Sequence, residues 1–217
     1  MPHYKHGKQK QLLTFEQIYN KVSAAKKHLT LESLAFFWLL YYCGCRKSEA
    51  YERTVADIKV TEDLFIIDFH QRKKRGETVD PLEIPRSFPG VDLLCEQLLK
   101  AKERKPSRKQ LIHSPEKGII ETRIVKARWL FPHINRTWAG VIVKRIMGEK
   151  YYPHYLRLNR LSEIGSDPGA NIIRLKSYSG IKSVKALEAY LGTSKKEQDA
   201  AIKYMATQIN PEQQSKS

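Results

Sequence analysis

Four side chains in this sequence have the chemistry needed to bind a phosphodiester and attack it: Arg46, His154, Arg157 and Tyr190. Guanidinium groups stay charged at any working pH and match phosphate oxygens in pairs, so two arginines can stabilise the charge of a five-coordinate phosphorus. An imidazole, with an ordinary pKa of about 6.5, can exchange a proton at neutral pH. A tyrosine hydroxyl can then act as the nucleophile, and this chemistry needs no metal ion.

Each of these residues also has an ordinary explanation. Arginine and histidine are usually solvated surface residues, and Tyr190 is one of 11 tyrosines, most of which should be half-buried core residues. The order of these residues along the chain and the residues beside them favour a phosphate-binding site instead. Arg46 lies in Gly-Cys-Arg-Lys-Ser-Glu directly after an apolar segment, Arg157 follows a histidine by three positions, and Tyr190 follows Gly180 by ten.

This arrangement resembles the catalytic domain of the tyrosine recombinases, the phage integrase family. In that family the first arginine lies in Arg-x-Ser-Glu, the second in His-x-x-Arg, and the tyrosine lies a set distance after a glycine. Residues 46–49 and 154–157 match the first two motifs, and Gly180 with Tyr190 matches the third in spacing. The resemblance covers roughly residues 13 to 208, and the chain is also somewhat similar to integrases of archaeal viruses and plasmids.

The resemblance implies a role for each residue. Arg46 and Arg157 would bind phosphate oxygens, and His154 would hydrogen-bond and handle protons near the nucleophile. Tyr190 would attack phosphorus to give a 3′-phosphotyrosine, with Tyr152, Tyr178 and Tyr204 as fallback candidates. Glu49, one turn after Arg46, is expected to hold that arginine through an ion pair.

The leaving 5′-oxygen needs a proton as its bond breaks, and the family supplies it from a lysine on a β-hairpin. The corresponding turn reads Gln-Arg-Lys-Lys-Arg-Gly over residues 71–76. We assign Lys73 as the general acid, with Lys74 as the alternative. The other interpretation of residues 71–76 is a turn that contacts phosphate and supplies no acid. DNA contacts are expected from the arginines beside the two lysines, Arg72 and Arg75, and from Lys47.

One residue departs from the family pattern. Ile181 stands where the family has His or Trp directly after the glycine, and an isoleucine cannot donate a hydrogen bond to phosphate. A second family histidine is likewise replaced by Leu158. Losing one donor costs on the order of a few kcal/mol of transition-state stabilisation, which slows a reaction without removing it. Two other functions therefore stay open: a non-catalytic DNA-binding protein with a degenerate site, and a type IB topoisomerase-like nicking-closing enzyme that needs no tetramer.

Composition favours a polyanionic partner. The formal charge is +16 and the pI about 9.7, which indicates double-stranded DNA. Recombination needs four sites, so a homotetramer on DNA is expected, without metal, ATP or another cofactor.

Cys43 and Cys45 have no second cysteine pair nearby, and buried free thiols are expected there rather than a zinc site. The sequence has no apolar run of about 18 residues and no apolar N-terminal signal, so a cytoplasmic, DNA-associated protein of a prokaryote, virus or plasmid is expected.

The elements that must position these residues belong to one domain. The fold should be mainly α with a small antiparallel β-hairpin or three-stranded sheet (α+β). We expect a basic flexible tail at 1–12, the catalytic domain at 13–209 and a flexible C-terminal tail at 210–217. Since few residues precede the first expected helix, the chain is either the catalytic domain of a longer integrase or a minimal one.

Hydrophobic spacing and capping residues predict the individual elements. A capping box at 14–17 opens a helix to about residue 27, and Gly44 ends an apolar helix over 31–42. The strands are expected at 64–69 and 79–84, and a basic loop at 105–118. The remaining helices are expected at 48–55, 91–104, 135–147, 157–164, 170–178, 183–191 and from a second capping box at 194.

Overall fold

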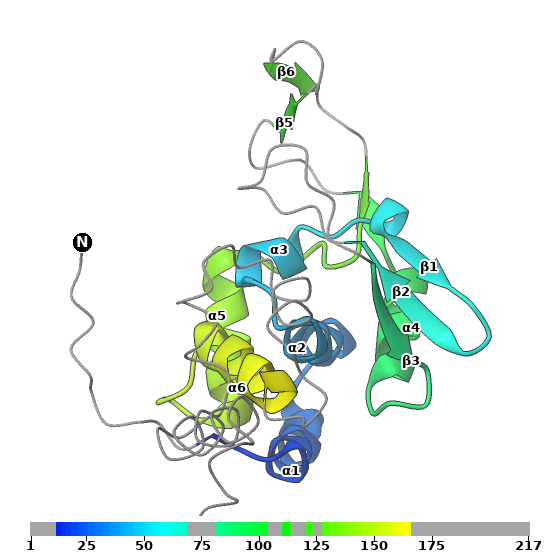
Figure 1. The fold of residues 1–217 in the computed structure, drawn as a ribbon. Coiled ribbons are helices and arrows are strands. Elements are labelled where there is room, and N and C mark those ends of the chain that lie inside the picture. Colours follow the sequence, from blue (N-terminus) through cyan, green and yellow to red (C-terminus); the bar gives the residue numbers. More distant parts are fainter. Residues whose placement is uncertain (1–11, 69–80, 104–109, 114–119, 124–126, 166–217) are drawn as a thin grey trace, which may run out of the picture.

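The computed structural model describes residues 12–68, 81–103, 110–113, 120–123 and 127–165. These residues form a mainly helical fold with small antiparallel sheets, as predicted (Figure 1). The helices are α1 (Phe15–Ala25), α2 (Leu31–Cys43), α3 (Lys47–Tyr51), α4 (Val91–Leu99), α5 (Arg136–Met147) and α6 (Pro153–Gly165), with short 3₁₀ turns at Lys26–His28 and Val55–Asp57. The predicted helices beyond residue 165 lie outside the described residues.

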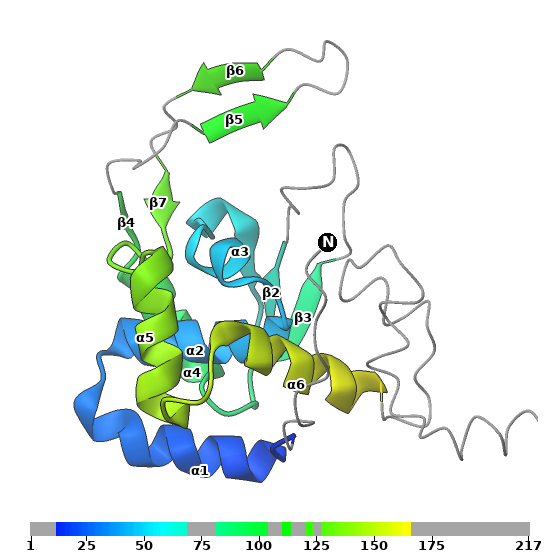
Figure 2. The same cartoon turned by 90° about the vertical axis from the view of Figure 1, so that its left-hand side faces the viewer.

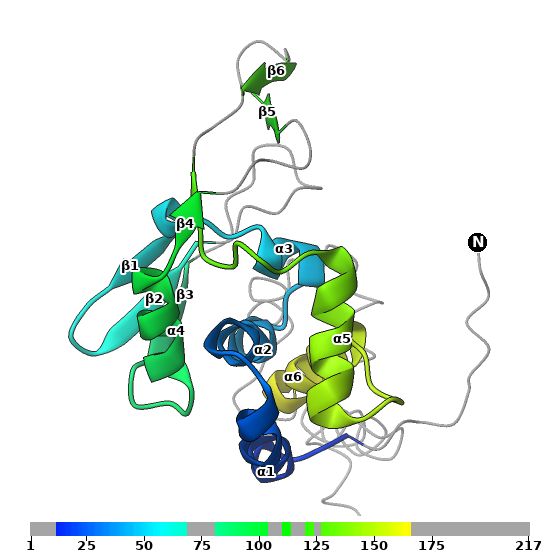
Figure 3. The same cartoon turned by 180° about the vertical axis from the view of Figure 1, so that it is seen from behind.

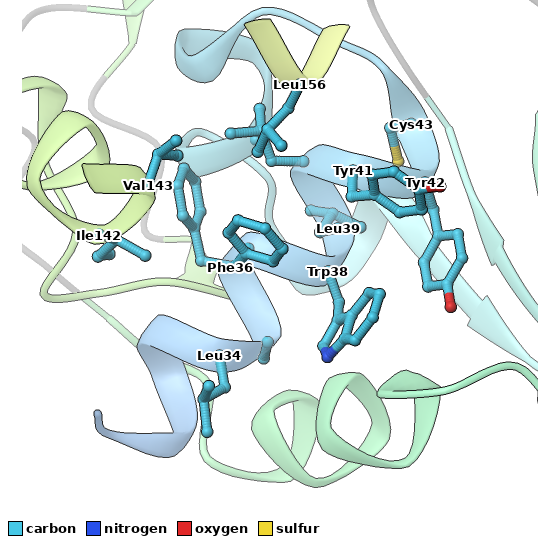
Figure 4. Packing of buried hydrophobic residues seen from close by; sticks show 14 of the residues in the cluster. Leu34, Phe36, Trp38, Leu39, Tyr41, Tyr42, Cys43, Ile142, Val143 and Leu156 are labelled. Atoms are coloured by element: carbon cyan, nitrogen blue, oxygen red, sulfur yellow. The ribbon is translucent and has the colours of Figure 1, made fainter. Parts of the chain in front are cut away.

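Helix α2 is the centre of the core. It is buried from Ser33 to Cys43, because its sequence is apolar on every face. Side chains of α5 and α6 close over it, among them Ile142, Val143 and Leu156 (Figure 4). On its other side it packs against α4 (Figure 3). The predicted stop is confirmed: Gly44 takes the left-handed conformation, with φ of 49°, and its N–H bonds the Tyr41 carbonyl.

The predicted hairpin is part of a three-stranded sheet. Strands β1 (Ile58–Val60), β2 (Leu64–Ile67) and β3 (Leu82–Pro85) are antiparallel in that order. Phe65 and Ile67 are buried while their neighbours are only partly covered, which is the alternation that the sequence indicates. The predicted strands at 64–69 and 79–84 extended too far toward each other, since β2 ends at Ile67 and β3 begins at Leu82, and β3 runs to Pro85, one residue past the predicted end.

Two helices are shorter than predicted. Helix α3 ends at Tyr51 rather than near residue 55, because the Arg53 N–H turns back to the Ala50 carbonyl (3.2 Å) and the Asp57 carboxylate accepts the Thr54 N–H (2.8 Å), starting a separate 3₁₀ turn. Helix α4 ends at Leu99 rather than near 104. The chain after it forms β4 (Lys102–Glu103), which pairs with β7 (Arg128–Trp129).

The prediction of a loop over 105–118 was wrong in its middle. Strand β5 (Gln110–His113) pairs with β6 (Ile120–Arg123) in an antiparallel ladder from Gln110 opposite Arg123 to His113 opposite Ile120. This hairpin lies apart from the helices, beyond β4 and β7 (Figure 2). Each of these strands is only four residues long, and so short a segment gives little periodic signal in the sequence.

The other helices begin and end at recognisable signals. Thr14 and Gln17 form the predicted capping box of α1, and Asn135 caps α5 by accepting two backbone N–H groups. Helix α6 begins at Pro153, four residues before the predicted start at 157. Proline is well tolerated in the first helical turn, where its missing N–H costs no bond.

Two other expectations can be compared with the structure. Cys43 and Cys45 are free and buried, as predicted, and Cys95 is partly buried. Among the described residues, no helix is both long and apolar enough to cross a bilayer.

Gly90 is the position where the fold most clearly requires glycine. Its φ is 79°, and a Cβ built there would overlap the indole ring of Trp38. We therefore expect Gly90→Ala to lower the free energy of unfolding by about 3 kcal/mol, from backbone strain and overpacking together. In thermal unfolding this is a fall of roughly 10 °C in Tm.

The matched control is Gly140→Ala in α5, where an added Cβ meets no atom within 4 Å. Alanine in a helix interior should raise stability by roughly 0.5–1 kcal/mol. Equal Tm values for the two variants would contradict the packing of Gly90 against Trp38.

Candidate active site

The junction between α2 and α3 positions Arg46. After the left-handed turn at Gly44, Cys45 is buried and Arg46 becomes the residue that caps α3. The Glu49 carboxylate accepts hydrogen bonds from Arg46 Nη1 (2.7 Å) and from the Arg46 backbone N–H (2.8 Å). The expected ion pair is therefore present. Since the Glu49 side chain is only 7% exposed and that of Arg46 is 44% exposed, a buried carboxylate holds an arginine that still reaches the surface.

Arg157 reaches the same junction from α6. It is buried, and its Nη1 donates to the Gly44 carbonyl oxygen at 2.6 Å, across 113 positions of sequence. That carbonyl lies at the C-terminal end of α2, where the helix dipole places partial negative charge, so a guanidinium is well matched to it. The Arg157 side chain is thus bonded to the backbone two residues before Arg46, at the junction of α2 and α3.

His154 lies one turn before Arg157 at the start of α6 and is exposed. Partial desolvation of the imidazole lowers the pKa of His154 below its usual value, and the positive charges of Arg157 and Arg46 lower it further. His154 is therefore neutral at pH 7 and has a ring nitrogen that can accept a hydrogen bond or a proton. The effect of both guanidinium groups indicates that the three side chains share one region of the molecule.

Two contacts from outside the predicted motifs hold α6 in place. The Tyr41 hydroxyl of α2 donates to Glu163 at 2.9 Å, and burial, with the nearby carboxylate, raises the pKa of Tyr41, which keeps the phenol protonated. The buried Asn159 side chain accepts the Leu13 N–H (2.8 Å) and donates to the Leu13 carbonyl (3.0 Å). Sequence reasoning missed these residues, because a tyrosine in an apolar run and an asparagine in a helix carry no distinctive spacing.

The described structure thus brings together part of the predicted site. Arg46, Glu49, His154 and Arg157 gather at the ends of three helices, and Lys47 lies beside them as the first, partly exposed residue of α3. Six further predicted residues lie outside the described residues: Arg72, Lys73, Lys74, Arg75, Ile181 and Tyr190.

Comparison with protein families shows that residues 11–197 match the family described as the phage integrase family. No curated protein sequence matches the chain.

Solved structures of recombinases resemble the fold. XerH site-specific recombinase bound to difH substrate, in a pre-cleavage complex, aligns with a TM-score of 0.60 at 16% identity over 88% of this chain. XerA recombinase aligns with a TM-score of 0.58 at 18% identity over 97% of this chain. The Tn1549 transposon integrase in complex with transposon right end DNA aligns with a TM-score of 0.59 at 15% identity over 94% of this chain. The matched parts are 52%, 67% and 68% of those chains, so this chain spans about half the length of XerH.

Proposed function

Because this chain belongs to the phage integrase family, we propose that it is a site-specific DNA recombinase that cleaves and rejoins DNA through a 3′-phosphotyrosine intermediate. The observation that carries the proposal is that Arg157 bonds the backbone two residues before Arg46, and that both guanidinium groups lower the pKa of His154. Positive charges gathered in one region attract an anion. A phosphodiester has the charge and the oxygen geometry for that position.

In the proposed reaction, Arg46 and Arg157 bind the two non-bridging oxygens of the scissile phosphate. Tyr190 attacks phosphorus, its oxygen forms the new P–O bond, and its proton passes to a base, for which the neutral His154 is suited. The bond from phosphorus to the 5′-oxygen breaks, and Lys73 or Lys74 gives a proton to the departing oxygen, which leaves as a 5′-hydroxyl. Attack by the 5′-hydroxyl of another strand reverses the step, so the bond energy is conserved and no ATP or metal ion is consumed.

The proposal includes the partner and the assembly. The charge of +16 suits a long DNA contact, and two of the similar solved structures are complexes with DNA. Exchange of strands between two duplexes takes four nucleophiles, so the active form would be a homotetramer on DNA inside the cell.

A non-catalytic DNA-binding protein is the second candidate, and Ile181 favours it. The family's hydrogen-bond donor is missing at this position, so a site that binds phosphate but cleaves slowly or not at all is the alternative outcome.

A nicked suicide DNA substrate distinguishes the two functions. Cleavage near the nick releases a short fragment that diffuses away, so the protein stays covalently attached and migrates more slowly on a denaturing gel. We expect this adduct. Sequence-specific binding without any adduct would instead support the non-catalytic candidate.

We expect Lys73→Ala to reduce adduct formation about 100-fold or more on ordinary DNA, the lower range for loss of a general acid. On DNA with sulfur at the bridging 5′ position the rate should recover to within a few-fold of the parent, because a thiolate leaves without a proton. Lys74→Ala is the matched control and should cleave both substrates. Sulfur rescue of Lys74→Ala alone would assign the acid to Lys74.

A further inference from the structure

Arg53 is a buried arginine that the proposed reaction does not use. It follows α3 directly, and only 5% of its surface is exposed. Its Nε donates to the Glu49 carbonyl oxygen at 2.8 Å, and its Nη1 donates to the Asp68 carbonyl oxygen at 2.9 Å. The Asp57 carboxylate lies 3.8 Å from the same Nη1.

These two carbonyls belong to the two segments that carry opposite sides of the proposed chemistry. Glu49 is the residue whose carboxylate holds Arg46, so its backbone belongs to the phosphate-binding side. Asp68 directly follows β2, and the chain that leaves it leads to Lys73 and Lys74. Arg53 is therefore a bridge between the arginine-bearing helix and the strand that precedes the basic turn.

Both backbone groups of Asp68, directly after β2, are hydrogen-bonded. Besides the bond from Arg53 to its carbonyl, the Asp68 N–H donates to the Asp57 carbonyl at 2.8 Å. Asp57 is itself tied down, because its carboxylate accepts the Thr54 N–H at 2.8 Å and the Thr54 hydroxyl at 3.0 Å. The residue from which the basic turn departs thus has a fixed position relative to α3.

Stability alone is a weak reason for this arrangement. Burying a guanidinium costs desolvation energy, and apolar residues of similar volume at such positions are often neutral or stabilising. An apolar side chain cannot bond two carbonyls, whereas the planar guanidinium bonds both from two nitrogens at fixed angles. Arginine at this position therefore orients the two backbone segments relative to each other.

We propose that Arg53 is a positioning residue, which sets the end of β2 relative to α3 and thereby fixes the point from which the chain runs on to Lys73 and Lys74, the candidate general acids of the proposed reaction. This inference rests on the proposed function. It is distinct from the role of Glu49, which orients Arg46 alone, and it assigns Arg53 no contact with DNA.

The sulfur-containing substrate separates positioning of the acid from structural support. In Arg53→Met, adduct formation on ordinary DNA should fall at least tenfold, because the acid is misplaced. On DNA with bridging 5′-sulfur, where no acid is needed, the same variant should stay within threefold of the parent. An equal loss on both substrates would overturn the inference, since damage to folding or to the phosphate-binding side affects both reactions alike.

Two more variants complete the comparison. Arg53→Lys keeps the charge, but its single nitrogen cannot reproduce the two separate, coplanar donors that bond the Glu49 and Asp68 carbonyls, so it should show the same preference for sulfur. It also replaces Arg53→Met in the comparison if that protein does not fold. The matched control is Arg86→Met, since exposed Arg86 bonds the Thr61 and Glu62 carbonyls at the other end of β2. It should leave the ratio of the two rates unchanged.

The outcomes also separate this inference from the proposed function. If the parent forms no adduct with either substrate, the proposed function fails, and the role of Arg53 fails with it. If the parent cleaves both substrates and neither Arg53 variant prefers sulfur, only the role of Arg53 fails.

Discussion

We expect Tyr190→Phe to abolish the covalent adduct with suicide DNA while DNA affinity stays within a few-fold of the parent. The change removes one hydroxyl group, which in the proposed mechanism is the atom that attacks phosphorus. The other residues of the proposed site are basic side chains and a carboxylate, none of which forms a stable phosphate ester in its stead. Affinity should persist because phosphate contacts from many lysines and arginines, spread along a wide surface, dominate DNA binding.

Tyr152→Phe is the matched control for this prediction. Tyr152 is exposed and lies two residues before His154, whereas Tyr155, directly after His154, is buried in the core. The control should form the adduct at the parental rate. Peptide mass spectrometry of the adduct would identify the modified tyrosine directly, and a modified peptide from any position other than 190 would overturn the assignment.

Arg157→Lys should lower the rate of adduct formation about 100- to 1,000-fold, the range observed when one donor to a developing oxyanion is removed. Arg157 bonds the Gly44 carbonyl through Nη1, which fixes the planar guanidinium at the α2–α3 junction, and in the proposed mechanism the same group also bonds phosphate. An ammonium group is a point charge on a flexible stem and cannot make both contacts in one plane. Keeping the charge should therefore preserve little of the rate.

Arg160→Lys, on the same helix, is the control for Arg157→Lys. Arg160 pairs with Glu163 at 3.0 Å near the surface, where ion pairs contribute little, so its rate should stay within a few-fold of the parent. Tm measured for both variants distinguishes lost chemistry from lost stability. If folded Arg157→Lys cleaves as fast as Arg160→Lys, Arg157 has a structural role only.

The parts of the fold that the sequence predicts well are those where local signals and burial agree. Helix α2 combines an unbroken apolar run with a glycine stop, and α1 and α5 begin at side chains that bond their first free N–H groups. The ion pair between Arg46 and Glu49 is equally predictable, because the two residues are three apart at the start of a helix.

The parts that sequence reasoning missed depend on partners distant in the chain. The end of α4 depends on Trp129 and Arg128, which draw residues 102 and 103 into a strand pair. The β5–β6 ladder pairs two strands of only four residues each, which is too short for a clear periodic pattern. Arg53 looks like any charged residue after a helix, and only the tertiary structure shows that it is buried between two carbonyls. Tyr190, Lys73, Lys74 and Ile181 stay predictions.

The pairing of Asn159 with Leu13 has a consequence for hydrogen exchange. A side-chain amide here satisfies both backbone groups of Leu13, as the next strand of a sheet would, and Asn159 lies two positions after Arg157. The Leu13 N–H can exchange with deuterated solvent only when this bond opens. Its exchange rate therefore measures how often α6 separates from the start of α1. The exchange rate of this one amide proton, far from His154 and Arg157 in the sequence, therefore reports how firmly the helix that carries both residues is docked, before any DNA is added.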